Sequence, residues 1–350
     1  MKTKHINSII ITIILILFSI TYAKEYFLFH SEDKAQTEQI KETKNTLSAF
    51  SFEDIKEVEN IELYRTPDKN LLKTLVQKIW EAKTRVYVEA YIFTEKDLRS
   101  ALVKAKKRWI DVKVLMEKNV YMANNINKKA YDEFVKNNIP VVWSDSTDYA
   151  LNHSKFFIID DLLVLSTWNW SYSMFTKNRD FMLFIDDKKI LEKILQTFNY
   201  DFKKERKYVY DDNLVLSPFF SREKLEFLIK NAKTEIKIYF PYFWDDSFQS
   251  LLEDKLDENV AVKIITDKKN ENLEEFKSLW FDAVALPKLT EHAKIILIDD
   301  KYLYIGSVNF STSSMDKNRE TGILLKNENI IKKLNDFFWE DFKDSLKNPL

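Results

Sequence analysis

Two copies of one pattern of polar residues have the clearest chemical meaning in this chain. Each copy has a histidine, a lysine two residues later and an aspartate five residues beyond the lysine: His153, Lys155 and Asp160 in the first, and His292, Lys294 and Asp299 in the second. The pattern would follow any given histidine by chance in roughly 1 case in 100. Because it follows two of only 4 histidines, we interpret it as a duplicated functional motif.

The histidine and the lysine of each copy are expected to face the same way. Both copies run into apolar segments of strand length, Phe156 to Ile159 and Ile295 to Ile298. Side chains two positions apart on a strand point to the same face of the sheet. A phosphate site needs an imidazole and an ammonium group on one common face, and each copy supplies both.

Each motif is followed by a polar turn and then by an Asn-Arg-acid triplet. The turn residues are Ser166, Thr167 and Asn169 in the first copy and Gly306, Ser307 and Asn309 in the second; the triplets are Asn178-Arg179-Asp180 and Asn318-Arg319-Glu320. The chain has only 2 glycines, Gly306 and Gly322, and both belong to the second copy. Glycine is required where φ is positive or where the backbone lies close to a ligand. We therefore expect Gly306 to tolerate few substitutions.

Length and composition describe an ordinary globular protein. The 350 residues exceed one average domain, so two domains or two halves sharing an interface are expected. Basic and acidic residues number 54 and 55, which argues against strong attraction of the whole chain to nucleic acid or anionic membrane. The absence of cysteine excludes disulfides, thiol nucleophiles and cysteine-ligated zinc.

The N-terminal segment has the features of an export signal. Lys2 and Lys4 precede an uncharged apolar run from Ile9 to Ala23. A run of this length is short for a membrane span and typical of a secretory signal, although Tyr26 to Phe29 would lengthen it into an uncleaved anchor. We expect residues 1–23 to be a signal peptide or a membrane anchor, so that the folded body is secreted, periplasmic or anchored to the membrane.

The chain contains an internal repeat, which follows a polar tether at residues 24–58. Residues 82–84 match residues 232–234 at an offset of 150, whereas the two motif histidines are offset by 139. The difference implies an insertion of about eleven residues in the first half, which we place at 118–138. The expected boundaries are residues 59–210 for the first half and residues 211–350 for the second.

Alternating helical and strand patterns predict an α/β fold. Helical periodicity at Leu71 to Ala82 and Leu98 to Arg108 alternates with β-branched or aromatic runs at Val86 to Ile92 and Val112 to Met116. This alternation is typical of βαβ-type units. The aromatic run Tyr239 to Trp244 is predicted to be part strand and part rim of the active site, either packed in the core or facing lipid.

The paired motifs, turns and triplets resemble those of the phospholipase D superfamily over roughly residues 60–345. The resemblance implies two similar α/β sandwich halves with mixed sheets, related by a pseudo-twofold axis, with one active site at their interface. It also implies that Asp180 and Glu320, which lie 27 and 28 residues after the two histidines, orient the imidazoles. Family precedent favours His153 as the nucleophile.

The residue types suit a two-step displacement at phosphorus. A neutral imidazole can attack a phosphodiester to form a phosphohistidine, and a second, protonated imidazole can protonate the leaving alkoxide. Water or an alcohol then enters, with the second histidine as the base. The expected phosphate-binding residues are Lys155, Lys294, Thr167, Asn169, Ser307 and Asn309. The scheme requires no metal and no cofactor, and Asp160 and Asp299 are expected to brace the ends of their strands.

The sequence departs from the superfamily pattern at two places. The first copy has Ser166-Thr167 where Gly-Ser is usual, with one residue fewer before the turn, so we expect a tighter turn there. Arg108-Trp109-Ile110 stands where relatives commonly carry an Arg-Gly-Val turn. We therefore expect the demand for a positive φ to be relaxed at Trp109.

The preferred function is that of an exported phospholipase D-like phosphodiesterase, which hydrolyses or transphosphatidylates phospholipid head groups. An exported nuclease of the same superfamily is the alternative, and a cardiolipin-synthase-like phosphatidyltransferase is a third option, weakened by the lack of a second apolar span. A catalytically inactive lipid-binding scaffold is disfavoured by the intact histidine and lysine of both copies. The expected partners are a phospholipid or other phosphodiester and a membrane surface, with nucleic acid as the alternative substrate, for a monomer that contains an internal pseudo-dimer.

Overall fold

The computed structural model describes residues 49–144, 147 and 149–349, together with Thr37, Glu38, Ile40, Lys41 and Leu47. The predicted signal or anchor at Ile9 to Ala23 lies outside these residues. The chain divides into two compact units, Met1–Ala49 and Phe50–Leu350, and both copies of the motif belong to the second. Among the described residues, no helix combines the length and the apolar character that crossing a membrane requires.

The first half is built on a mixed sheet of seven strands. Its elements are β1 (Ile61–Arg65), α2 (Lys69–Glu81), β2 (Arg85–Ala90), α3 (Lys96–Lys107), β3 (Asp111–Met116), α4 (Lys128–Lys136), β4 (Val141–Trp143), β5 (Lys155–Ile159), β6 (Leu162–Ser166), α5 (Tyr172–Thr176), β7 (Asn178–Arg179), β8 (Phe181–Ile185) and α6 (Lys188–Lys203). The strand order is β1-β8-β6-β5-β2-β3-β4. Strands β2, β3 and β4 are parallel and connected by α3 and α4, as the predicted βαβ units require. The remaining neighbours are antiparallel.

The second half repeats this topology. Its elements are β9 (Leu214–Ser217), α7 (Ser221–Lys230), β10 (Glu235–Phe240), β11 (Phe243–Trp244), α8 (Asp246–Asp257), β12 (Ala261–Thr266), α9 (Leu273–Ser278), β13 (Asp282–Ala285), β14 (Thr290–Glu291), β15 (Ile295–Ile298), β16 (Tyr302–Gly306), β17 (Phe310–Ser311), α10 (Thr312–Asp316), β18 (Glu320–Leu325) and α11 (Glu328–Lys347). The order β13-β12-β10-β15-β16-β18-β9 corresponds strand for strand to the first sheet read from its other end. The predicted pair of similar α/β halves with mixed sheets is confirmed.

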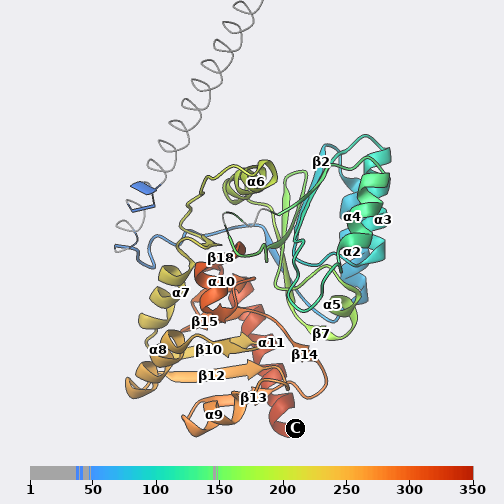
Figure 1. The fold of residues 1–350 in the computed structure, drawn as a ribbon. Helices are drawn as coiled ribbons and strands as arrows, with labels where there is room; N and C mark the ends of the chain where they lie inside the picture. Colours follow the sequence, from blue (N-terminus) through green and yellow to red (C-terminus); the bar gives the residue numbers. More distant parts are fainter. Residues whose placement is uncertain are drawn as a thin grey trace, which may run out of the picture. The chain divides into compact units, whose positions relative to one another are not determined.

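Helices cover both faces of the first sheet. Figure 1 shows α2, α3 and α4 together on one face and α6 on the other. Leu71, Leu75 and Ile79 recur every four residues of α2 and are buried, which is the spacing of a helix face directed at a core. Asp68 starts this helix by accepting a hydrogen bond from the Asn70 amide at 2.8 Å.

One hydrophobic core extends across both halves. A single buried cluster contains Phe156 and Phe198 of the first half together with Tyr239 and Phe338 of the second. The rings of Phe181 and Tyr239 meet across the interface with centroids 5.3 Å apart. This shared core fixes the position of one motif relative to the other, because neither half can shift without opening apolar contacts.

The predicted aromatic run is packed for most of its length. Tyr239, Phe240 and Phe243 are buried, whereas the indole of Trp244 is 66% exposed. Packing therefore accounts for the strand part of this run, and only its end faces solvent.

The prediction of a relaxed backbone at Trp109 is wrong, because its φ is 69°. The amides of Trp109 and Ile110 return to the carbonyls of Lys106 and Ala105 at 3.0 and 3.3 Å, a helix ending that places a left-handed residue between helix and strand. Asn259, which occupies the equivalent place in the second half, has φ 65°. The path from helix to strand imposes this conformation on whichever residue stands there.

Gly306 is required by close packing against the neighbouring strand and the ring of Tyr304, and not by a positive φ. Neither glycine has a positive φ. A Cβ at Gly306 would lie 2.4 Å from the Cα of Gly322 on the adjacent strand and 2.7 Å from the hydroxyl of Tyr304. The first half has Ser166 and Val164 at the positions of Gly306 and Tyr304. Glycine thus occurs in the half that has the large tyrosine ring, and serine occurs in the half that has the smaller valine.

The Gly306→Ala substitution should therefore lower the free energy of unfolding by about 1–3 kcal/mol, because the added methyl group overpacks this pocket. Urea denaturation would measure the change. In a Tyr304→Val background, which copies the first half, the same substitution should cost less. An equal cost in both backgrounds would show that the tyrosine is not the cause.

Asp160 and Asp299 clamp the starts of neighbouring strands. The carboxylate of Asp160 accepts hydrogen bonds from the backbone amides of Lys83, Thr84 and Arg85 at 2.7 to 3.1 Å. Asp299 makes the same contacts to the equivalent amides of the second half. Both aspartates thus brace strand ends at the far end of their motifs.

Candidate active site

The two motifs meet because each half extends its triplet against the motif of the other half. Strand β14 pairs in parallel with β7, and an isolated bridge joins Asn152 to Arg319 in the same manner. The backbone amide of His153 donates to the carbonyl of Arg319 at 2.7 Å, and the amide of His292 donates to the carbonyl of Arg179 at 3.2 Å. Each histidine is therefore held by backbone from the opposite half.

Each imidazole also faces the carboxylate of the opposite half. Nδ1 of His153 lies 2.8 Å from Oε2 of Glu320, and Nδ1 of His292 lies 3.6 Å from Oδ1 of Asp180. The resemblance implied that these two acids orient the imidazoles, and the structure pairs each of them with the histidine of the opposite half. One half alone would lack the group that orients its imidazole.

The turn hydroxyls hold these carboxylates. Ser307 Oγ donates to Glu320 at 2.6 Å, and Thr167 Oγ donates to Asp180 at 2.8 Å. Ser307 and Thr167 were expected to bind phosphate, but their hydroxyl hydrogens are directed at the acids instead. The shorter first-copy turn with Ser166-Thr167 preserves this contact, so its departure from Gly-Ser leaves the site geometry intact.

Two asparagines remain for the phosphate. Asn169 is buried, and its Oδ1 has no hydrogen-bond partner within the described residues. Asn309, at the equivalent position, is half-buried. Both come two residues after the hydroxyls that hold the carboxylates, and their side-chain amides are groups that can donate to a ligand.

Both motif lysines are fully buried beside the histidines. Nζ of Lys155 donates to the carbonyl of His153. Nζ of Lys294 donates to the carbonyl of His292 and lies 2.6 Å from Nδ1 of the same residue. Burial lowers the pKa of Lys294 to about 8 and that of Lys155 well below its ordinary value. An anionic ligand would oppose this effect and favour the charged form of both lysines.

Both imidazoles are neutral at neutral pH. Burial lowers the pKa of His153 to about 4, although Glu320 partly opposes the shift. Burial, reinforced by the charges of Lys294 and Lys155, lowers the pKa of His292 well below its usual range. A neutral imidazole is the nucleophilic form, so each ring is ready to attack before a ligand enters.

The two carboxylates differ in charge state. Burial raises the pKa of Asp180 to about 7. Burial acts in the same direction on Glu320, but attraction to His153 and Lys155 and hydrogen bonds from His153 and Ser307 outweigh it and leave the pKa below its ordinary value. Glu320 is therefore ionised at neutral pH, while Asp180 titrates there. This asymmetry separates the roles of the two histidines.

Two buried ion pairs behind the site also cross the interface. Arg319 of the second half binds Asp201 of the first in a bidentate contact at 2.7 and 2.6 Å. Arg179 of the first half binds Asp341 of the second at 2.7 and 2.9 Å. Sequence reasoning assigned these four residues no role. The available signal was that Asp201 and Asp341 match between the repeats, each beside an apolar helix face.

One further buried acid breaks the symmetry of the site. Glu291 precedes His292, where the first half has Asn152 before its histidine. Both carboxylate oxygens of Glu291 are buried without a hydrogen-bond partner in the described part of the chain. Burial raises its pKa well above the ordinary value, which favours the protonated form. Nothing in the sequence pattern had distinguished this residue.

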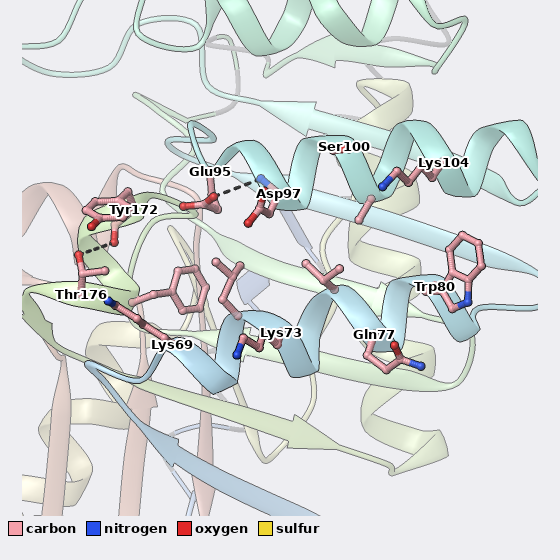
Figure 2. Close-up of a pocket in the computed structure, with 14 residues that line it drawn as sticks. Lys69, Lys73, Gln77, Trp80, Glu95, Asp97, Ser100, Lys104, Tyr172 and Thr176 are labelled. Carbon is pink, nitrogen blue, oxygen red and sulfur yellow. Dashed lines mark hydrogen bonds between the residues drawn. The ribbon is translucent and has the colours of Figure 1, made fainter.

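A separate groove of about 710 Å³ lies on the outer helical layer of the first half. Figure 2 shows it between α2 and α3, with Tyr172 and Thr176 of α5 at one end and Trp80 towards the other. It contains none of the motif residues. Among the described residues, no group of three or more histidine, aspartate and glutamate side chains is arranged to hold a metal ion.

Comparison with known proteins matches both halves of the chain. A family model described as "Cardiolipin synthase, PLD-like domain" matches residues 75–202 and again residues 225–342. A protein named phospholipase D from Rickettsia prowazekii (strain Madrid E) is 25% identical over 140 residues, and one of the same name from Rickettsia typhi is 24% identical over 140 residues. Each alignment covers 40% of this chain and 66% of the relative, so the chain spans slightly less than two thirds of the length of either.

Solved structures share the fold of most of the chain. Phosphatidylserine synthase from Haemophilus influenzae Rd KW20 superposes with a TM-score of 0.67 at 16% identity, covering 89% of this chain and 91% of its own. Polyphosphate kinase from Porphyromonas gingivalis superposes with a TM-score of 0.64 at 14% identity, covering 80% of this chain and 50% of its own. At these identities the likeness concerns the fold alone.

Proposed function

The chain belongs to the phospholipase D superfamily, and from this premise we propose that it is a phosphodiesterase that cleaves phospholipid head groups through a phosphohistidine. The observation that carries the proposal is the pair of crossed histidine–carboxylate contacts beside two buried lysines. These groups supply a nucleophile, a proton donor and phosphate-binding cations in one site. The rickettsial relatives named phospholipase D support a lipid substrate.

In the first step, Nε2 of His153 forms a bond to phosphorus. Its Nδ1 is bonded to Glu320, which leaves Nε2 as the free, nucleophilic nitrogen. The bond from phosphorus to the head-group oxygen breaks, and that oxygen takes a proton from His292. The phosphodiester anion offsets the lysine charges that lower the pKa of His292, so substrate binding itself enables His292 to carry this proton.

In the second step, the acceptor replaces His153 on phosphorus. A water oxygen forms a bond to phosphorus, its proton passes to His292, and the bond from Nε2 to phosphorus breaks. The products are phosphatidic acid and the free head-group alcohol. An alcohol in place of water would give a new phosphodiester by the same route.

A substrate panel tests this proposal. The purified protein would be incubated with phosphatidylcholine, phosphatidylethanolamine and phosphatidylglycerol vesicles, and separately with single-stranded DNA. We expect release of head group and phosphatidic acid by the wild type, and none by His153→Ala or His292→Ala. Cleavage of DNA alone would establish the nuclease alternative, and turnover that survives both substitutions would place the active site elsewhere.

The second candidate function is phosphatidyl transfer to an alcohol. The description of the matching family model, which names cardiolipin synthase, favours it. The two candidates share the phosphohistidine and differ only in the acceptor. Adding glycerol or phosphatidylglycerol to the reaction separates them, because a transferase would form the new diester in preference to phosphatidic acid. Export by the N-terminal segment remains part of the proposal, and fractionation of the producing cells would test it.

A further inference from the structure

A loop that is five residues longer in the first half than in the second lies at the end of the sheet that holds His153. Eleven residues, Glu117 to Asn127, join β3 to α4, whereas six residues, 267–272, join β12 to α9. This segment, here called the mouth loop, overlaps the region 118–138 in which the sequence predicted the insertion. It follows the carboxyl end of β3, and the motif histidine precedes β5 at the same end of the sheet.

The mouth loop is attached to the active site through Tyr91. The ring of Tyr91 packs edge-on against the imidazole of His153, with centroids 4.7 Å apart. Its hydroxyl accepts a hydrogen bond from the backbone amide of Tyr121 at 2.8 Å. Nδ2 of Asn127 donates to the carbonyls of Tyr91 and Glu117 at 2.6 and 2.8 Å. These hydrogen bonds therefore hold the loop at a fixed position relative to His153.

The tip of the mouth loop exposes apolar side chains. Tyr121 is 77% exposed, Met122 is 89% exposed and Ile126 is 37% exposed. Met122 has φ 54°, a left-handed conformation that asparagine and glycine adopt at lower cost. The fold thus holds a large apolar side chain in solvent on a backbone that does not favour it.

The exposed charges of the mouth loop and of the first residues of α4 are basic. Lys118, Lys128 and Lys129 are exposed, and Lys128 pairs with Asp132 of α4. The only carboxylate of the loop, Glu117, is 3% exposed and accepts hydrogen bonds from Ser144 and Asn152 inside the protein. An apolar tip flanked by lysines complements an anionic bilayer surface.

The second half contributes one exposed aromatic at the equivalent end of its own sheet. Trp244 follows β10 and pairs, through β11, with the segment after the turn of Asn309. Its indole is 66% exposed and stacks on Tyr242 with centroids 5.1 Å apart. Tryptophan and tyrosine are the side chains that favour the boundary between bilayer and water.

We propose that the mouth loop docks the active site on the surface of a bilayer that contains anionic phospholipids. Tyr121 and Met122 enter the boundary region, the lysines attract the negative head groups, and Trp244 adds a second contact. The inference rests on the proposed function, because it identifies the substrate as phospholipid in a bilayer. It goes beyond that function because it requires the protein to bind an anionic bilayer even when no reaction takes place.

Vesicle binding of the double variant Tyr121→Ser/Met122→Asn tests the proposal. The fragment 50–350 is used, because it holds every strand pairing of the two large sheets and lacks the apolar N-terminal run. Co-sedimentation with vesicles of phosphatidylcholine and phosphatidylglycerol should show at least about tenfold weaker binding. The hydrogen bond to Tyr91 comes from the Tyr121 backbone and survives, and asparagine suits the φ of Met122. Thermal unfolding should therefore be unchanged or raised.

Trp109→Asn is the matched control. Trp109 is 95% exposed and also has a positive φ, but it precedes β3 at the end of the strand opposite the mouth loop. It should leave vesicle binding unchanged. Equal losses in the control and the double variant, or no loss in the double variant, would overturn the proposal.

Activity on a soluble, short-chain phospholipid below its micellar concentration separates this inference from the proposed function. The double variant should retain it while losing activity on vesicles. Absence of activity in the wild type together with normal vesicle binding would contradict the proposed enzymatic function and support the docking surface. Activity without any vesicle affinity would support the enzymatic function and overturn the docking surface. A loss of affinity for single-stranded DNA in place of vesicles would reassign the loop to nucleic acid.

Discussion

The Glu320→Gln substitution should lower kcat by about 10⁴-fold, because it reverses the hydrogen-bond role of the group that faces Nδ1 of His153. The carboxylate accepts a hydrogen bond from Nδ1–H, which leaves Nε2 unprotonated. The glutamine amide can donate to Nδ1 and stabilise the opposite tautomer, in which Nε2 carries the hydrogen and cannot attack. The two side chains have the same shape, so the fold should persist, as thermal unfolding would show.

The same variant identifies the nucleophile when it is compared with Asp180→Asn. A substrate with a good leaving group needs no proton from His292 in the first step. With such a substrate, Asp180→Asn should still form the phosphohistidine and accumulate it, because only the second step requires His292 as a base. Glu320→Gln should form none. Acid quenching followed by peptide mass spectrometry would locate the adduct, and an adduct on His292 in either variant would reverse the assignment.

The pH dependence follows from the same contact. The pKa of His153 is about 4 in the folded protein, so the nucleophile stays neutral down to that pH. The acid limb that His153 contributes should therefore lie near pH 4. Removal of the negative charge in Glu320→Gln takes away an interaction that raises this pKa, so the limb should move to lower pH in the residual activity.

The sequence was sufficient to predict the local parts of the site. The spacing of His153 and Lys155 places both on one face of a strand, and the second copy repeats that placement. Repeat offsets and alternating patterns predicted two α/β halves, because strand and helix periodicity depend on near neighbours. These features need no knowledge of how distant segments meet.

The crossed pairing of His153 with Glu320 was beyond such reasoning. Glu320 lies 167 residues from His153, whereas Asp180 lies in the same half and at a spacing that suggests a partner. Only the shared core determines which acid faces which ring. The positive φ expected as one reason for Gly306 was wrong for a related reason, because the close contacts come from Gly322 on an adjacent strand and from the ring of Tyr304.

The Arg319→Met substitution should destabilise the protein by about 3–5 kcal/mol, because it leaves the carboxylate of Asp201 buried without its partner. Arg319 and Asp201 are both at most 6% exposed, so water cannot replace the lost contacts. The second acid nearby, Glu89, already has a pKa raised to about 8 by burial and by Asp201. Removing the positive charge of Arg319 leaves the repulsion between the carboxylates of Glu89 and Asp201 without compensation.

The double variant Asp201→Leu/Arg319→Met should recover most of the lost stability, since a buried ion pair replaced by apolar side chains is often neutral or better. Urea denaturation of the single and double variants gives the coupling energy directly. Lys332→Met is the control, because its pair with Asp336 is largely exposed and should contribute at most about 1 kcal/mol. The arginine backbone that accepts the His153 amide is retained in the double variant. Recovered stability with recovered activity would therefore mean that the ion pair serves only to hold the halves together, whereas recovered stability without activity would assign it to the alignment of His153 with Glu320.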